Sequence, residues 1–318
     1  MVEHILVPLD GSSLAECVLP HTVAFARAFD ARVTLLRAVA RRSGEEGSSA
    51  ADPLSWHMRK SEADAYLTGV GEKLREIGLE TKAVLAEGRA AGRIIHYARQ
   101  EAVDLIVISS HGDSGLSEWN ISSVVQKVIL RAYTPALIVR AYQRVLEDLA
   151  DLSYERLLLP LDGSKRAECT LPWATALTSF HEGTLLLTHV VKKPEVPRRA
   201  PLTEEEKELV KQLTELNREK GEAYLEDLQN RFDLAVESRL LVSDDPALAL
   251  HQVVDDEQVD LVIMAAHGYS GETLWPYGSI ALNFIAYGSK PLLIVQDISP
   301  EEAAVTEAER AASERAGH

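Results

Sequence analysis

The chain consists largely of two copies of a similar sequence. Residues 3–20 and 155–172 are identical at 12 of 18 positions, and residues 103–115 match residues 259–271 further along both copies. The offset between the copies is 152 residues in the first block and 156 in the second, so the second copy carries a short net insertion, which we place around residues 192–205. Two collinear blocks of this kind indicate two copies of one domain.

Each copy alternates short apolar runs with longer helical patterns. This alternation is typical of a parallel α/β sheet whose strands are buried on both faces. We expect strands at residues 4–9, 32–39, 81–86, 104–109, 136–140, 156–161, 184–191, 236–242, 260–265 and 292–296. We expect helices at residues 14–29, 57–77, 92–101, 117–132, 167–180, 203–232, 247–257 and 279–287. The predicted fold class is therefore α/β, with two tandem open five-stranded parallel-sheet domains.

These elements also predict where the domains begin and end. We expect a first domain at residues 1–141, a charged linker at 142–154, a second domain at 155–298 and an acidic tail rich in Ala and Glu at 299–318. The helix expected at residues 203–232 carries an apolar stripe at helical spacing, which we expect to face the core. The stripe comprises Leu209, Leu213, Leu216, Tyr224, Leu225 and Leu228.

Composition excludes several classes of function. The chain has 33 Lys and Arg against 49 Asp and Glu, a formal charge of −16, which disfavours non-specific binding of nucleic acid. No apolar run approaches the roughly 18–20 residues that a membrane span needs, and the first residues lack the basic start of a signal peptide. With only two cysteines, the composition favours a reducing, cytoplasmic setting.

Two motifs follow strand ends in each copy. The first is Asp-Gly-Ser after the first strand, at residues 10–12 and 162–164. An Asp at this place can accept a hydrogen bond from a ribose hydroxyl, hold a water on a metal ion, or order the turn before the next helix. The second motif, after the fourth strand, places Gly268 ten residues before Gly278-Ser279 at a predicted helix start. Glycines and a helix N-terminus can cradle phosphate, but the same residues also make ordinary turns and caps.

Two further residue types repeat between the copies. Cys17 and Cys169 occur singly, without a CxxC motif or a nearby His/Cys pair, and we interpret them as small buried helix residues. His111 and His267 precede the glycine of the second motif, and we interpret them as structural loop residues. No metal site is predicted.

Taken together, the motifs, their order and the five-strand alternation resemble the universal stress proteins over nearly the whole chain, in two copies. The resemblance implies a five-stranded α/β fold of the adenine-nucleotide alpha-hydrolase-like type. Nucleotide-binding members of this family carry Gly, two residues, Gly, nine residues, Gly and then Ser or Thr after the fourth strand. The residues at these four positions are Ala265, Gly268, Gly278 and Ser279 in the second copy and Ser109, Gly112, Ser122 and Ser123 in the first. The second copy thus keeps more of the phosphate cradle.

The resemblance also implies where a nucleotide would bind. In the second copy the further contacts fall on Asp162, Val190 and Gly271. In the first copy they fall on Asp10, Val39 and Gly115. Neither loop after the fourth strand contains Lys or Arg, so Mg²⁺ or basic residues from elsewhere would have to neutralise a triphosphate. Arg89 and Arg93 are candidates in the first copy, whereas residues 243–246 of the second copy are acidic.

The function implied by the resemblance is a cytoplasmic, non-enzymatic regulator of the stress response that binds ATP or another adenine nucleotide, with its site in the second domain. Two alternatives stay open. One is a scaffold that binds a protein partner without nucleotide, its phosphate loops being vestigial. The other is a slow ATPase, for which His267 is the one candidate to position the attacking water.

The resemblance further implies a pairing of the two domains through their last strands, residues 136–140 and 292–296, as an intramolecular pseudo-dimer. Whether the chain also forms a homodimer stays open, and a regulatory protein partner is expected but not identified. We expect no nucleic-acid or membrane partner.

Overall fold

The computed structural model describes residues 2–40, 53–112, 121–141, 148–194, 203–269 and 276–297. Two site residues proposed from the sequence, Gly115 and Gly271, lie outside the described residues, as does the tail at 299–318. The described residues form two compact units. Those within Met1–Ser153 and Ile285–His318 belong to the first unit, and those within Tyr154–Phe284 belong to the second.

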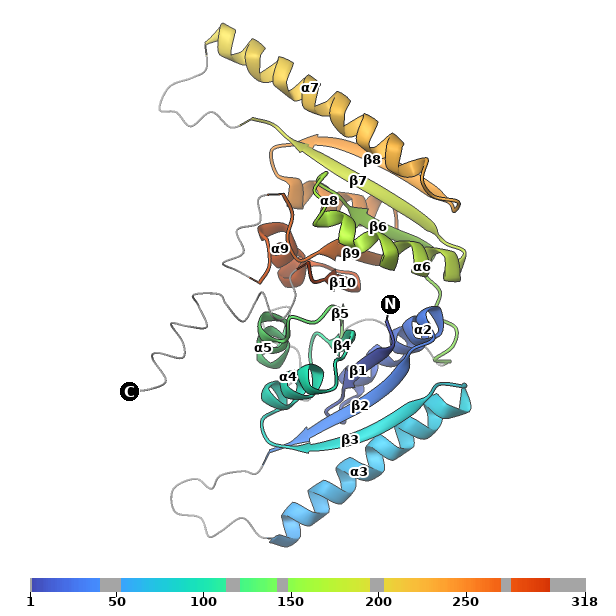
Figure 1. The fold of residues 1–318 in the computed structure, drawn as a ribbon. Helices are drawn as coiled ribbons and strands as arrows, with labels where there is room; N and C mark the ends of the chain where they lie inside the picture. The colour runs from blue at the N-terminus through green and yellow to red at the C-terminus, as the bar shows by residue number, and fades with distance from the viewer. Residues whose placement is uncertain are drawn as a thin grey trace, which may run out of the picture. The chain divides into compact units, whose positions relative to one another are not determined.

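Parallel strands form the sheet of the first unit, in the order β3-β2-β1-β4-β5. These strands are β1 (His4–Pro8), β2 (Arg32–Val39), β3 (Thr81–Glu87), β4 (Leu105–Ser109) and β5 (Ala136–Val139). The helices are α1 (Ser13–Glu16), α2 (Val18–Phe29), α3 (Pro53–Glu76), α4 (Ala90–Gln100) and α5 (Ser123–Ala132), with α3 running alongside β2 and β3 in Figure 1. Every residue of β4 and β5 is buried, which explains their unbroken apolar sequences.

Parallel strands also form the sheet of the second unit, in the order β9-β6-β7-β8. They are β6 (Arg156–Pro160), β7 (Thr184–Lys192), β8 (Val236–Ser243) and β9 (Leu261–Ala265). The helices are η1 (Ala167–Thr170), α6 (Leu171–His181), α7 (Glu204–Gln229), α8 (Pro246–Asp256) and α9 (Ser279–Tyr287), of which α9 belongs to this unit as far as Phe284. The predicted strands of both copies are therefore confirmed to within one residue at their ends.

The last strand, β10 (Leu292–Val295), pairs antiparallel with β5 in the first unit. Leu292 lies opposite Ile138, and Ile294 lies opposite Ala136. All four β10 residues are buried. The predicted pairing of the last strands of the two copies is confirmed by this register.

The first predicted helix of each copy is divided in two. In the first copy α1 ends at Glu16 and α2 begins at Val18, and in the second copy η1 is followed by α6 from Leu171. A proline lies in the first turn after each break, at Pro20 and Pro172. Proline has no N–H to continue the hydrogen-bond ladder, and it is tolerated where a helix starts.

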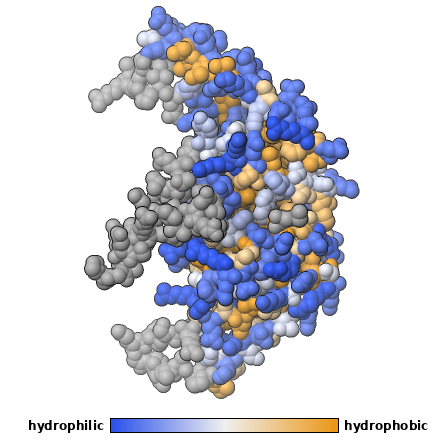
Figure 2. Space-filling view, in the orientation of Figure 1, coloured by the Kyte–Doolittle hydropathy of each residue, from blue (hydrophilic) through white to orange (hydrophobic). Residues whose placement is uncertain are grey.

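One packing expectation is wrong over part of its length. The C-terminal half of the α7 stripe is in the core, where Leu225 and Leu228 are 3% and 0% exposed. Among the described residues, however, Leu209, Leu213 and Leu216 are 65%, 43% and 45% exposed, and Figure 2 shows apolar side chains at the surface over this half of the helix. The capping box formed by Thr203 and Glu206 stabilises the start of α7, so the helix extends past the sheet without apolar burial.

Within the described ranges, none of the helices combines the length and the apolar character that crossing a membrane requires.

Candidate functional site

Each unit has a cavity at the carboxyl ends of the first and fourth strands of its copy. These strands are β1 and β4 in the first unit and β6 and β9 in the second, and between them the strand order reverses. Open parallel sheets bind ligands at such switch points. The cavity volume is about 120 Å³ in the first unit and about 160 Å³ in the second.

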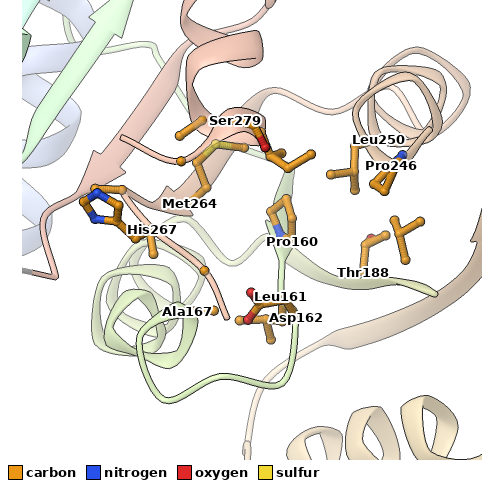
Figure 3. Close-up of a pocket in the computed structure, with 17 residues that line it drawn as sticks. Pro160, Leu161, Asp162, Ala167, Thr188, Pro246, Leu250, Met264, His267 and Ser279 are labelled. Atoms are coloured by element: carbon orange, nitrogen blue, oxygen red, sulfur yellow. The ribbon is translucent and has the colours of Figure 1, made fainter. Parts of the chain in front are cut away.

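The second cavity brings together five residues proposed from the sequence. Asp162, Val190, Gly268, Gly278 and Ser279 all line it. Figure 3 shows Asp162 and Ser279 on opposite sides of the cavity. Four segments therefore line the second cavity: the turn after β6, the strand β7, the loop after β9 and the start of α9.

The apolar part of this cavity comes from neighbouring strands and α8. Met264 of β9, Leu250 and Pro246 of α8, and Thr188 of β7 line it beside Val190. Figure 3 shows Pro246, Leu250 and Thr188 grouped on one side. Met264 and Leu250 were not predicted as site residues. In the sequence, an apolar residue of a strand or helix looks the same whether it lines a cavity or packs in the core.

The first cavity contains only part of the proposed set. Asp10, Gly112 and Ser122 line it, but Val39 and Ser123 do not. Pro8 pairs with Leu36, as Pro160 pairs with Thr188, so the equivalent of Val190 is Ala38, which does line the cavity. Adjacent strand residues point to opposite faces, and the assignment of Val39 was one residue out of register.

The aspartate after the first strand of each copy orders the adjoining turn. Asp10 Oδ1 accepts hydrogen bonds from the Ser12 N–H at 2.9 Å and the Ser12 hydroxyl at 2.7 Å. Asp162 Oδ1 accepts from the Ser164 N–H at 3.0 Å, and its Oδ2 accepts from the Tyr269 N–H in the loop after β9. Asp162 therefore links the turn after β6 to the loop after β9, and we call these two hydrogen bonds the Asp162 clasp. The carboxylate is exposed and has lone pairs left for a ligand.

The glycine after the fourth strand is required by this clasp. A Cβ on Gly268 would lie 2.2 Å from Asp162 Oδ2, and a Cβ on Gly112 would lie 2.0 Å from Asp10 Oδ2. Neither glycine has a φ in the left-handed region. The need for glycine at these positions is thus a matter of space beside a carboxylate and not of backbone strain.

The two copies differ at the helix start that faces the cavity. In the first unit Ser122, with φ −72°, caps α5 through a hydrogen bond from the Val125 N–H to its Oγ at 3.4 Å. In the second unit Gly278 precedes α9, and its N–H donates to the Ala266 carbonyl at 2.8 Å, as the Ser122 N–H donates to the Ser110 carbonyl. Glycine has no side chain that can cap a helix, so the first N–H groups of α9 keep no side-chain acceptor from this position.

The charges around the two cavities also differ. Among the described residues, the lining of each cavity contains one carboxylate residue, Asp10 or Asp162, and no Lys or Arg. Arg89 precedes α4 beside the first cavity, and Arg93 folds over Gly88, so that a Cβ on this glycine would lie 2.6 Å from Arg93 Nε. The residues of the second unit that correspond to the two arginines are Asp245, whose side chain caps α8, and the buried Ala249.

The repeated histidines are part of the loop structure. His111 and His267 are 4% and 3% exposed and line their cavities. The Nδ1 of His111 lies 3.1 Å from the Ser110 hydroxyl. Of the repeated cysteines, Cys17 is buried as expected, whereas Cys169 is partly exposed.

A repeated pair of tyrosine and glutamate was missed from the sequence. The Tyr224 hydroxyl donates to Glu168 Oε1 at 3.1 Å. In the first unit Tyr66 is near Glu16, but among the described residues its hydroxyl has no hydrogen-bond partner within the same distance limit. Burial first, and then the charge of the glutamate, raise the pKa of both phenols well above the usual range. The sequence Ala-Tyr-Leu, at residues 65–67 and 223–225, is the signal that would have revealed this pair.

Comparison with known proteins agrees with the fold and the motifs. The model of the universal stress protein family matches residues 1–140 and 153–296. The universal stress protein YxiE of Bacillus subtilis is 32% identical over 150 residues, covering 44% of this chain and 100% of that protein. The universal stress protein MJ0531 of Methanocaldococcus jannaschii is 28% identical over 142 residues, covering 44% of this chain and 83% of that protein.

Solved structures cover both copies together. A universal stress protein from Archaeoglobus fulgidus superposes with a TM-score of 0.63 at 17% identity, covering 93% of this chain and 98% of that one. A functionally unknown protein from Pseudomonas aeruginosa superposes with a TM-score of 0.68 at 15% identity, covering 98% of each chain. These two structures support the tandem fold, and the family match over both copies shows that the chain belongs to the universal stress protein family, as a member with two such domains.

Proposed function

We propose that this protein is a non-enzymatic regulator of the stress response whose second unit binds ATP or another adenine nucleotide. In this proposal the phosphates lie at the start of α9, against the backbone N–H groups of Ser279 and the residues after it. Asp162 accepts a hydrogen bond from a ribose hydroxyl. Val190 and Met264 contact the adenine. The bound nucleotide is a signal that changes what the protein binds, and not a substrate.

The observation that carries the proposal is the difference between Gly278 and Ser122. A helix N-terminus that opens into a cavity is a site for an anion, because its N–H groups are unpaired and its dipole is positive there. Gly278 itself supplies no side-chain cap to this end of α9, whereas the Ser122 hydroxyl already accepts a hydrogen bond from α5. The residues of the second cavity therefore fit a phosphate better than those of the first.

The cavity walls support a nucleotide over inorganic phosphate alone. Apolar side chains from β7, β9 and α8 lie beside the cradle, and Asp162 stands opposite Ser279. The lining carries no Lys or Arg among the described residues, so we propose that Mg²⁺ accompanies the phosphates and offsets their charge.

The proposal is tested by calorimetric titration of the ligand-stripped full chain with ATP and MgCl2. We expect one site per chain. Replacing Gly278 with Asp caps α9 and puts a carboxylate where the phosphates bind, so Gly278→Asp should abolish the heat of binding while the chain stays folded. Ser122→Asp makes the same change at the equivalent position of the first copy and should leave the binding unchanged.

Other outcomes identify the alternatives. No heat in the wild-type chain, together with no thermal stabilisation by ATP, would favour a scaffold that binds a protein partner without nucleotide. Release of phosphate at a rate that Gly278→Asp abolishes would favour a slow ATPase.

We assign residues 1–141 and 155–298 to two domains, joined by a linker at 142–154, that act as an intramolecular pseudo-dimer. Pairing of β5 with β10 supports this assignment. We further propose that the protein acts in the cytoplasm through a regulatory protein partner. Light scattering, compared with the chain mass of 35.0 kDa, decides whether two chains also associate.

A further inference from the structure

The second unit has a larger groove on the α7 side of its sheet, with a volume of about 670 Å³. His189 of β7 and Asn217, Gly221 and Tyr224 of α7 line it, together with Gly163 of the turn after β6. It shares Asp162 and Val190 with the nucleotide cavity. Neighbouring residues of a strand point to opposite faces, so the two spaces lie on opposite sides of β7.

The same place in the first unit is filled by the side chain of Arg37. The register of β1 with β2, compared with that of β6 with β7, makes Arg37 the equivalent of His189. A Cβ on Gly11 would lie 2.8 Å from Arg37 Nη2, and the guanidinium lies 5.1 Å from the ring centroid of Tyr66. At the equivalent Gly163, no atom of the described residues lies within 4 Å of such a Cβ.

Two substitutions explain why the groove is open in the second unit. His189 is shorter than Arg37, and its Nδ1 is held by the Leu161 carbonyl at 2.8 Å. Gly221 occupies the position of the buried Ala63, and a Cβ there would lie 2.6 Å from Leu240 Cδ1 and 2.9 Å from His189 Cδ2. The glycine makes room for the imidazole against the helix, which leaves the space beyond it empty of protein side chains among the described residues.

The surroundings that hold the guanidinium in the first unit are kept in the second. Arg37 lies over the ring of Tyr66, whose phenol is near the carboxylates of Glu16 and Asp10. Tyr224 lines the groove, donates to Glu168, and is near Asp162. Arg231 also acts on Tyr224, but less strongly than the two carboxylates, and it pairs with Asp227. A tyrosine ring and two carboxylates attract a planar cation.

The rim of the groove has the opposite character. Lys192 and Lys220 line it and are exposed. The residues at these positions in the first copy are Ala40 and Glu62, so both lysines are particular to the second copy. An acidic, aromatic inner end and a basic rim together match a ligand with a cation at one end and an anion at the other.

We propose that this groove binds a small zwitterion with a guanidinium or alkylammonium head and a carboxylate tail. The head takes the place that the Arg37 guanidinium takes in the first unit, against Tyr224 and near Asp162. The carboxylate lies toward Lys192 and Lys220. The proposal does not rest on nucleotide binding, because the groove lies on the other face of the sheet from the cradle at Gly278.

The test is a calorimetric titration of the full chain with 4-guanidinobutyrate, which has one guanidinium and one carboxylate. Butylguanidinium and pentanoate, which each have only one of the two charges, should bind at least about fivefold more weakly, since each loses one charge contact. Equal affinity for pentanoate and 4-guanidinobutyrate, or no binding of 4-guanidinobutyrate, would overturn the proposal.

Variants then locate the site. Lys220→Glu introduces the residue type that the first copy has and should weaken 4-guanidinobutyrate about fivefold or more, whereas Lys211→Glu makes the same charge change on α7 outside the groove and should have little effect. His189→Arg should abolish binding although it adds a positive charge, because the new guanidinium fills the groove as Arg37 does. Equal effects of the two lysine variants, or undiminished binding by His189→Arg, would refute the assignment.

Two variants distinguish the proposed nucleotide site from the proposed zwitterion site. Gly278→Asp should remove ATP binding and leave 4-guanidinobutyrate binding intact, and Lys220→Glu should do the reverse. If Gly278→Asp abolished the binding of 4-guanidinobutyrate and Lys220→Glu did not, the compound would bind in the nucleotide cavity, and the groove assignment would be overturned.

Discussion

The clasp between Asp162 and the loop after β9 makes Gly268→Ala an informative substitution. A Cβ at this position would lie 2.2 Å from Asp162 Oδ2, against an ordinary contact of at least 3.4 Å. The carboxylate must therefore move by more than 1 Å, and it then loses the hydrogen bond from the Tyr269 N–H.

The size of the effect follows from two opposing contributions. A hydrogen bond to a charged group contributes about 1.5–3 kcal/mol, and the value here lies at the lower end because Asp162 is exposed. Alanine in a backbone conformation that it tolerates stabilises by about 0.4–1 kcal/mol through the unfolded chain. We expect a net loss of about 1 kcal/mol in the free energy of unfolding, measured by urea denaturation.

A double-mutant cycle isolates the cause. In an Asp162→Ala background the carboxylate is gone, so Gly268→Ala should no longer destabilise and should give the small gain expected from the unfolded chain. The backbone amide resonance of Tyr269 should shift in both single variants. An equal cost of Gly268→Ala with and without Asp162 would refute the clasp as the reason for glycine at this position.

Three other predictions follow from the fold. Leu293→Pro removes a ladder donor in β10 and should lower the free energy of unfolding by at least about 1 kcal/mol in urea; unchanged stability would argue against the β5–β10 pairing. Burial raises the pKa of the Cys17 thiol, so iodoacetamide at pH 8 should alkylate Cys17 more slowly than the partly exposed Cys169, and mass spectrometry showing equal rates would contradict this. Burial lowers the pKa of His4 below 6.5, so the unfolded chain binds this proton first and stability should fall as the pH drops from 6.5 through the folded pKa; an equally steep fall in His4→Asn would show that His4 is not the cause.

Most of the fold was predictable because each strand and helix pattern occurs twice in the sequence, so that one copy supports the assignment in the other. Buried parallel strands are continuous apolar runs, and the same runs recur at a nearly constant offset, as in Leu105–Ser109 and Leu261–Ala265. The helix breaks just before Pro20 and Pro172 could have been predicted from the sequence, because proline marks a helix start or a kink. The exposed half of α7 was not readable, since periodicity shows that a face is apolar but not how far the sheet extends beneath it.

The candidate site also contains residues that could be predicted from the sequence and residues that could not. Asp162, Gly268 and Gly278 carry chemical or conformational signals, and the structure brings them together. Met264 carries no such signal, and Val39 was misplaced because a shift of one residue reverses the face of a strand. The groove beside α7 depends on the absence of one long side chain, that of Arg37, at the equivalent position in the second copy, and only the comparison of two folded copies exposes such a difference.

The most direct test of nucleotide binding in the second unit uses the methionine methyl groups. The chain has three methionines, of which Met264 lines the second cavity and Met58 lies on α3 of the first unit. In protein labelled with ¹³C at the methionine methyl groups, titration with ATP and MgCl2 should shift the Met264 resonance until one equivalent is bound and leave Met58 unchanged, because the adenine ring current acts over a short range. Saturable binding of ATP that leaves the Met264 resonance in place would contradict the account.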